Sequence, residues 1–128
     1  MWPGNARPYL GMRLDYNDRL FRASTNSAGG QVDDQTLFSY RQYGDVVWAT
    51  YQGGAIAFGT MVGVIRNDDT LDLRYQHVST RGEIRSGRCR STPEVLADGR
   101  VRLQEAWEWT EGGVGAGTST VEQVKTPT

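Results

Sequence analysis

Strict alternation between apolar and polar residues in two segments constrains the fold more than any other feature of this sequence. In residues 71–77 and 101–109, one parity carries leucine, valine and aromatic residues together with His77 and Glu105, and the other carries mostly charged or amide residues. Only an extended strand sends successive side chains to opposite faces. Both segments are therefore predicted to be strands with one buried and one solvent-facing side.

The rest of the chain is divided into similar lengths by turn-forming residues. Glycines or Asn/Asp pairs recur about every 10–15 residues, which is the spacing of β-hairpins, and no proline interrupts the chain between Pro8 and Pro93. Helix-like periodicity is missing almost throughout, although residues 7–19 are compatible with a short turn of helix. Strands are predicted over residues 19–25, 31–42, 46–51, 55–65, 71–77, 83–92, 101–109 and 115–124.

A sheet of eight hairpin-linked strands with one apolar face is stable only if that face is buried away from water. Closing the sheet on itself buries it and also removes the two edges that would invite aggregation. Short, regular turns favour an up-and-down order over a Greek key. The sequence thus predicts an all-β, single antiparallel up-and-down barrel over residues 19–124, preceded by an arm (1–18) and followed by a tail (125–128).

Composition narrows the possible functions. The 128 residues, of which 38% are hydrophobic, fit one domain with its own core. With a net charge of −1, the chain has no excess of positive charge that would favour binding to nucleic acid or to an anionic membrane surface. No apolar run is long enough to span a bilayer. One cysteine allows no internal disulfide, and the N-terminal residues lack a signal-peptide core. A cytoplasmic location is expected, while the oligomeric state is left open.

Two polar residues on the predicted inner faces are the main candidates for chemistry. His77 follows Tyr75 in the apolar row, and Glu105 lies between Leu103 and Trp107. A buried carboxylate is costly unless it is paired or used. Glu105 either anchors a ligand N–H or acts as a base, or else it forms a buried ion pair, for example with an arginine, or lies near the mouth of the barrel. His77 is either a polar group in a cavity or a core imidazole satisfied by a neighbour.

Aromatic residues could form one wall of a cavity that holds a flat ligand. The alternative is ordinary core filling, because an eight-stranded barrel has little space left after its own side chains. The register around Gly53 decides where Trp48 points, since a bulge would invert it. The aromatic candidates are Tyr40, Trp48, Tyr75, Trp107 and Trp109.

The remaining reactive groups give weaker signals. Cys89 lies between Arg88 and Arg90, and strand parity predicts a small buried thiol beside the cavity while both arginines face water. With Arg81, Arg85 and Arg100, these arginines form either a solvated face or a mouth that attracts an anionic ligand. One histidine and one cysteine without ligand spacing predict neither a metal site nor a cofactor.

Several segments together resemble the avidin-like domain family of small bacterial proteins, mostly of unassigned function. They are FSYRQ (38–42), VWATYQGGAI (47–56), RYQH (74–77), GRCRSTPE (87–94) and RLQEAWEW (102–109). The resemblance implies a barrel with a cavity over roughly residues 20–124. Some members are labelled N-acetylglutamate synthase, but the chain has no Gly-rich strand-to-helix turn to bind a pyrophosphate. The biotin-contacting motifs of true avidins are not matched residue by residue, so biotin binding is not implied.

These observations predict a small-molecule binding module with an aromatic-lined barrel cavity, whose ligand is aromatic or anionic. The predicted ligand-binding residues are Tyr40, Trp48, Tyr75, His77, Cys89, Glu105, Trp107 and Trp109. The alternative is a cofactor-independent enzyme, of isomerase, cyclase or lyase type, in which His77 and Glu105 transfer protons.

Overall fold

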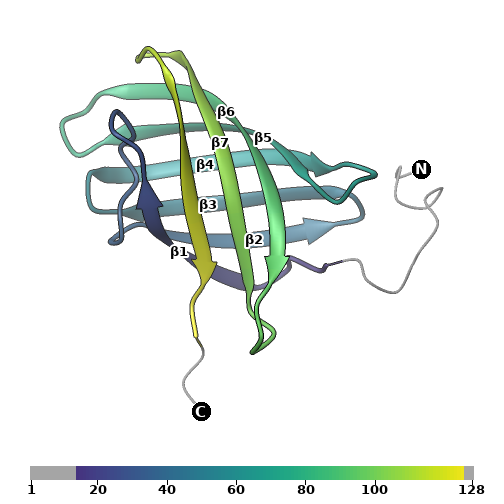
Figure 1. The fold of residues 1–128 in the computed structure, drawn as a ribbon. Helices are drawn as coiled ribbons and strands as arrows, with labels where there is room; N and C mark the ends of the chain where they lie inside the picture. The colour runs from purple at the N-terminus through teal and green to yellow at the C-terminus, as the bar shows by residue number, and fades with distance from the viewer. Residues whose placement is uncertain (1–13, 126–128) are drawn as a thin grey trace.

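A computed structural model describes residues 14–125, and eight antiparallel strands make up most of this length. Each strand pairs with the next one in the chain, and β8 pairs with β1 to close a barrel (Figure 1). This confirms the predicted all-β, up-and-down barrel. The strands are β1 (Arg19–Asn26), β2 (Leu37–Tyr43), β3 (Val46–Gly53), β4 (Ile56–Ile65), β5 (Leu71–Ser79), β6 (Ile84–Val95), β7 (Val101–Glu111) and β8 (Ala116–Gln123).

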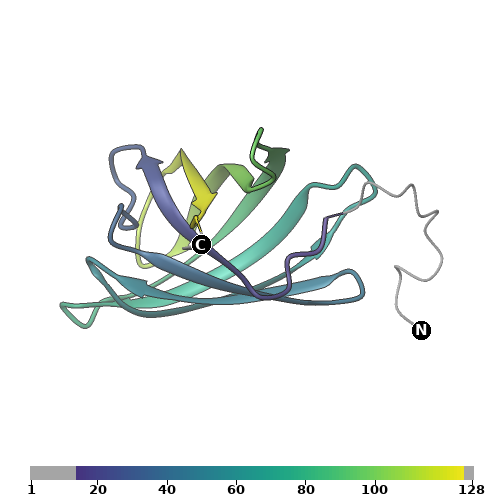
Figure 2. The ribbon, with the colours of Figure 1, turned by 90° about the horizontal axis from the view of Figure 1, so that it is seen from below.

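The barrel has two walls that face each other. Seen from below, β2 to β5 form one wall, β1, β7 and β8 form the other, and β6 joins them on one side (Figure 2). Within residues 14–125, the structure contains no helix that is long and apolar enough to cross a membrane.

One end of the barrel is filled by side chains. There the leucines of the two alternating segments and the rings of Phe21 (β1) and Tyr40 (β2) are fully buried. Tyr16, which precedes β1, is 1% exposed and packs with its ring centroid 6.0 Å from that of Tyr40. The residues that fill this end include Phe21, Val47, Ile65, Leu71, Leu73, Val101, Leu103 and Val121.

The facing predicted from the period-two pattern is confirmed. Leu71, Leu73 and His77 of β5 point inward, and Arg74 and Gln76 point to solvent. The same alternation holds along β7. Register is fixed because a slip of one residue would expose the whole apolar row.

The second and sixth strands differ from the prediction. β2 starts at Leu37 because Asp33 begins a turn, in which Gln35 N donates to its Oδ1 at 2.8 Å and Thr36 N to its carbonyl at 3.0 Å. Residues 27–36 are therefore a loop. β6 continues through Pro93, because pairing with β5 ends at Ser91 and no neighbour on that side needs the missing N–H.

The short turn of helix that residues 7–19 could form is not found in the part of this segment that the structure describes. Residues 14–18 approach β1 as an irregular segment with a turn at Asp18, whose φ is 62°. Residues 7–13 lie outside the described residues, as do 126–128.

Candidate functional site

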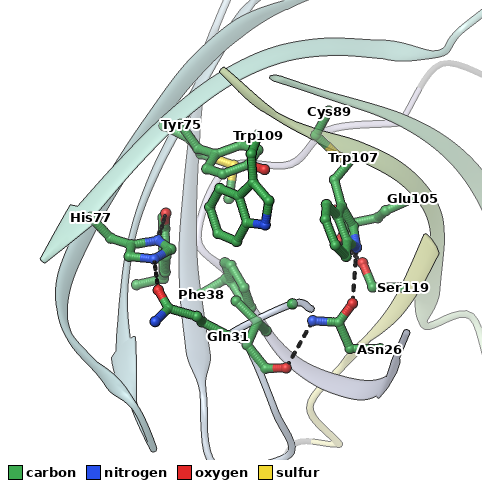
Figure 3. A pocket seen from close by; sticks show the side chains of 14 residues that line it. Asn26, Gln31, Phe38, Tyr75, His77, Cys89, Glu105, Trp107, Trp109 and Ser119 are labelled. Atoms are coloured by element: carbon green, nitrogen blue, oxygen red, sulfur yellow. Dashed lines mark hydrogen bonds between the residues drawn. The ribbon is translucent and has the colours of Figure 1, made fainter. Parts of the chain in front are cut away.

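A pocket opens at the end of the barrel where β1, β3, β5 and β7 finish (Figure 3). Its walls are mostly aromatic, and the loop of residues 27–36 reaches over its mouth with Gln31 and Val32. The space open to the centre of a water molecule is about 50 Å³. Since one water needs roughly 10–15 Å³ of such space and a cavity that binds benzene has about 150 Å³, the pocket admits a few waters or a small planar group.

Two tryptophans of β7 and a tyrosine of β5 form one side of the pocket. The ring centroid of Trp109 lies 5.6 Å from that of Trp107 and 5.8 Å from that of Tyr75. Glycines on the neighbouring strands make room for these rings: a Cβ on Gly117 would stand 2.5 Å from Trp107 Cζ2, and one on Gly87 would collide with the Tyr75 hydroxyl. Because these glycines have no side chain, the ring of Trp107 can lie over β8 and the ring of Tyr75 over β6.

Glu105 brings a carboxylate into this aromatic surrounding. Its Oε1 accepts a hydrogen bond from Ser119 and its Oε2 one from Ser91, both at 3.0 Å. Burial raises the pKa of the carboxyl, whereas the hydroxyl groups and the Cys89 thiol lower it. Among residues 14–125, the polar partners of this carboxylate are thus hydroxyl and thiol groups, and no arginine forms the ion pair weighed from the sequence.

His77 lies on the opposite side of the pocket from Glu105 (Figure 3). Its Nδ1 is 2.8 Å from the hydroxyl of Tyr51, and its Nε2 is 2.7 Å from Oε1 of Gln31. Because the Gln31 oxygen only accepts, this arrangement places the ring proton on Nε2. Burial, followed by the positive charge of Arg85, lowers the pKa of His77 to about 4. The imidazole is therefore neutral at pH 7.

The loop of residues 27–36 is tied to the pocket through both indole groups. Trp107 Nε1 donates to Asn26 Oδ1 at 2.9 Å, and Trp109 Nε1 donates to the Gly29 carbonyl at 3.2 Å. Asn26 also donates through Nδ2 to the Val32 carbonyl at 2.9 Å. The two tryptophans thus present their ring surfaces, and not their N–H groups, to the pocket.

Six of the eight predicted binding residues line this one pocket. His77 and Glu105 therefore share a cavity with the aromatic wall, and Cys89 lies beside them with its thiol 3.6 Å from Ser91 Oγ. Burial and the Glu105 carboxylate raise the pKa of this thiol well above its ordinary value. The six are Tyr75, His77, Cys89, Glu105, Trp107 and Trp109.

The structure does not bring Trp48 and Tyr40 into this pocket. Val47, Ala49 and Tyr51 occupy the inner parity of β3, so Trp48 faces outward, is 41% exposed and pairs with Val62. The bulge near Gly53 does occur, but it follows Trp48 and does not invert it. Tyr40 points inward, yet it lies below the pocket in the filled end of the barrel.

The arginines do not gather at one mouth. Arg88 and Arg90 are exposed on the outer face, where Arg88 pairs with Glu108 at 2.7 Å. Arg100 pairs with Asp98 at the opposite end of the barrel. Arg85 stacks beside the pocket, with its guanidinium carbon 5.2 Å from the Trp109 ring centroid.

Sequence reasoning missed several pocket residues. Ser119 and Phe38 share the inner parity of Val121 and Tyr40, so alternation along their strands could have found them. Asn26 and Gln31 belong to a strand end and a loop, for which the sequence carries no periodic signal. Within the described residues, no group of three or more His, Cys, Asp or Glu side chains is arranged to hold a metal ion.

Comparison with known proteins gives a family but no close relative. No curated protein matches the chain, and no solved structure matches it. A family model described as avidin-like protein matches residues 14–124, which include all eight strands and every described pocket residue. The chain belongs to the avidin-like protein family.

Proposed function

We propose that this protein is a small-molecule binding module, and that its ligand inserts an aromatic or other flat group into the pocket beside Trp107 and Trp109. A barrel of eight strands suits the binding of small molecules in general. The observation that carries the finer proposal is the aromatic lining: Tyr75, Trp107 and Trp109 enclose a space in which ring surfaces, and few polar groups, are offered to a ligand.

Binding is favoured over proton-transfer catalysis by the state of His77. A general base near neutral pH needs a pKa close to the working pH and a free nitrogen. Both ring nitrogens are engaged, by Tyr51 and Gln31, and the pKa is about 4. In this proposal His77 holds Gln31 of the loop over the pocket and takes no part in a reaction.

Ligand-observed NMR with single-ring probes, phenol and benzamide, tests the proposal. We expect saturation transfer from the protein to both probes and its loss in Trp109→Ala, because this change removes one wall of the pocket. Trp48→Ala is the matched control, since Trp48 lies on the outer face. Transfer that persists in Trp109→Ala or disappears in Trp48→Ala would contradict the proposed pocket.

A further inference from the structure

The hydrogen-bond donors of the pocket wall are already used within the protein. Both indole N–H groups donate to residues 26 and 29, and the hydroxyl of Tyr75 donates to the Glu108 carbonyl at 3.3 Å. Ser91 and Ser119 donate to Glu105. On the far side, the N–H of His77 is held by Gln31. The strands thus offer a ligand almost no free donor.

The acceptors of the wall are not used up. A carboxylate can accept about four hydrogen bonds. Each oxygen of Glu105 accepts one from a serine, and the Cys89 thiol is a third donor. Because Glu105 lines the aromatic pocket, the acceptor capacity that is left is available to a ligand there. The faces of Trp107, Trp109 and Tyr75 add negative π-surface, which attracts cations. Among the described residues, the strand residues that line the pocket carry no positive charge, and the indole, imidazole, phenol and serine donors named above already have acceptors.

Arg85, a positive charge beside the pocket, does not pair with Glu105. Arg85 stacks on Trp109 at the rim, and its charge acts on His77. The groups that set the pKa of Glu105 are its own burial and the hydroxyl and thiol donors, and Arg85 is not one of them. The floor of the pocket therefore contains a carboxylate without a cation among residues 14–125.

We propose that the ligand carries a positively charged, planar N–H group, such as an amidinium, a guanidinium or a protonated heterocyclic amine, which binds Glu105 between the aromatic rings. The inference rests on the proposed binding function and adds the chemical class of the ligand. A planar cation supplies the donors that the wall lacks, neutralises the buried carboxylate and stacks on the tryptophans. The size of the pocket limits the inserted part to a small planar group, such as the amidinium head itself.

Three probes of nearly equal shape test the charge requirement: benzamidine, benzamide and benzoate, titrated at pH 7 and followed by tryptophan fluorescence in a Trp48→Phe background. Trp48 lies on the outer face, and a further Trp2→Phe exchange leaves Trp107 and Trp109 as the tryptophans that give the signal. We expect benzamidine to bind at least tenfold more tightly than benzamide, and benzoate to bind most weakly. Glu105→Gln should weaken benzamidine at least tenfold and change benzamide less than threefold.

A second carboxylate on the same strand provides the control. Glu108 faces outward and pairs with Arg88, so Glu108→Gln should leave benzamidine binding unchanged. Circular dichroism of both variants checks that the barrel is folded, and if Glu105→Gln does not fold, the ranking of the three probes on the protein with the two Trp→Phe exchanges decides alone. Equal or tighter binding of benzamide or benzoate would overturn the cationic ligand and leave the aromatic pocket standing. If none of the three probes binds, both the cationic ligand and the proposed binding function are overturned.

Discussion

The indole Nε1 of Trp107 donates a 2.9 Å hydrogen bond to Oδ1 of Asn26, and this bond joins the last residue of β1 to the pocket face of β7. Through its Nδ2 the same asparagine holds the Val32 carbonyl, so one side chain connects the pocket wall with the loop above it. The position of the loop and that of the Trp107 ring therefore both depend on the Asn26 side chain.

Asn26→Ala should loosen the loop and uncover the pocket. The change removes two hydrogen bonds, each worth about 1 kcal/mol, and leaves the indole N–H of Trp107 without its partner. We expect acrylamide to quench the pocket tryptophans more strongly, and amides of residues 27–32 to exchange faster. Ser24→Ala, on the same strand but exposed, should change neither. Unchanged quenching in Asn26→Ala would show that the loop is held by other contacts.

Glu105→Gln should leave the free energy of unfolding within about 1 kcal/mol of the wild type. The carboxylate is held by serine hydroxyls, which can bond an amide as well, and its burial is costly as a charge. Breaking a buried ion pair would instead cost about 3–5 kcal/mol. Urea denaturation of the two proteins at pH 7 distinguishes these cases, and a loss in the larger range would mean that Glu105 has a cationic partner.

The buried neutral His77 should make stability depend on pH. Its ordinary pKa is 6.5 and its folded pKa is about 4, so between these values the unfolded chain binds more protons than the folded one. The contribution is complete above pH 6.5 and is lost as the pH falls toward 4. Glu105, with its raised pKa, has the opposite slope above its own unfolded value.

Comparison with His77→Gln separates the two slopes, because the variant retains Glu105. Lowering the pH from 7 to about 5.5 should reduce the stability of the wild type relative to His77→Gln by about 1 kcal/mol, since one pKa unit corresponds to about 1.4 kcal/mol and His77 is 3% exposed. Urea melts at the two pH values measure this difference. A difference that does not change with pH would mean that His77 titrates normally in the folded protein.

Gly117→Ala should displace the ring of Trp107. The new Cβ would collide with the Ser27 hydroxyl and stand 2.5 Å from Trp107 Cζ2. The serine hydroxyl can rotate away, whereas a stiff indole packed in a barrel has little room to move. Overpacking of this kind costs about 1–3 kcal/mol. The near-ultraviolet circular dichroism of the tryptophans should change with it. Thr118→Ala, the next residue and exposed, should stay within about 0.5 kcal/mol. A silent Gly117→Ala would show that the ring is loosely packed.

The barrel was predictable because burial imposes period two on its strands. Leu71 and Leu103 mark the inner face so clearly that His77 and Glu105 could be placed in the interior without a structure. The same rule predicted that Cys89 faces inward between two outward arginines, as the structure shows. Local alternation therefore identifies the residues that can reach a cavity.

Alternation does not identify what surrounds those residues. The facing of Trp48 stayed open because β3 carries apolar side chains on both faces, so that parity alone was ambiguous. The partners of Glu105 come from β6 and β8, and those of His77 come from β3 and from a loop. Such contacts depend on the closed register of the barrel and on loop conformation, neither of which leaves a periodic trace in the sequence.

The closure of the barrel in chain order has a consequence for how the protein folds. Every ladder joins strands that are neighbours in the chain, except the one between β1 and β8, where Phe21 meets Gln123. This ladder raises the contact order and bears the largest loop-closure entropy, so we expect it to form last and to limit the folding rate. A circular permutant that joins residues 14 and 125 and opens the turn at Gly113 would make the β1–β8 pairing local. The ladder between β7 and β8 would then be the one that closes the barrel last and limits the folding rate.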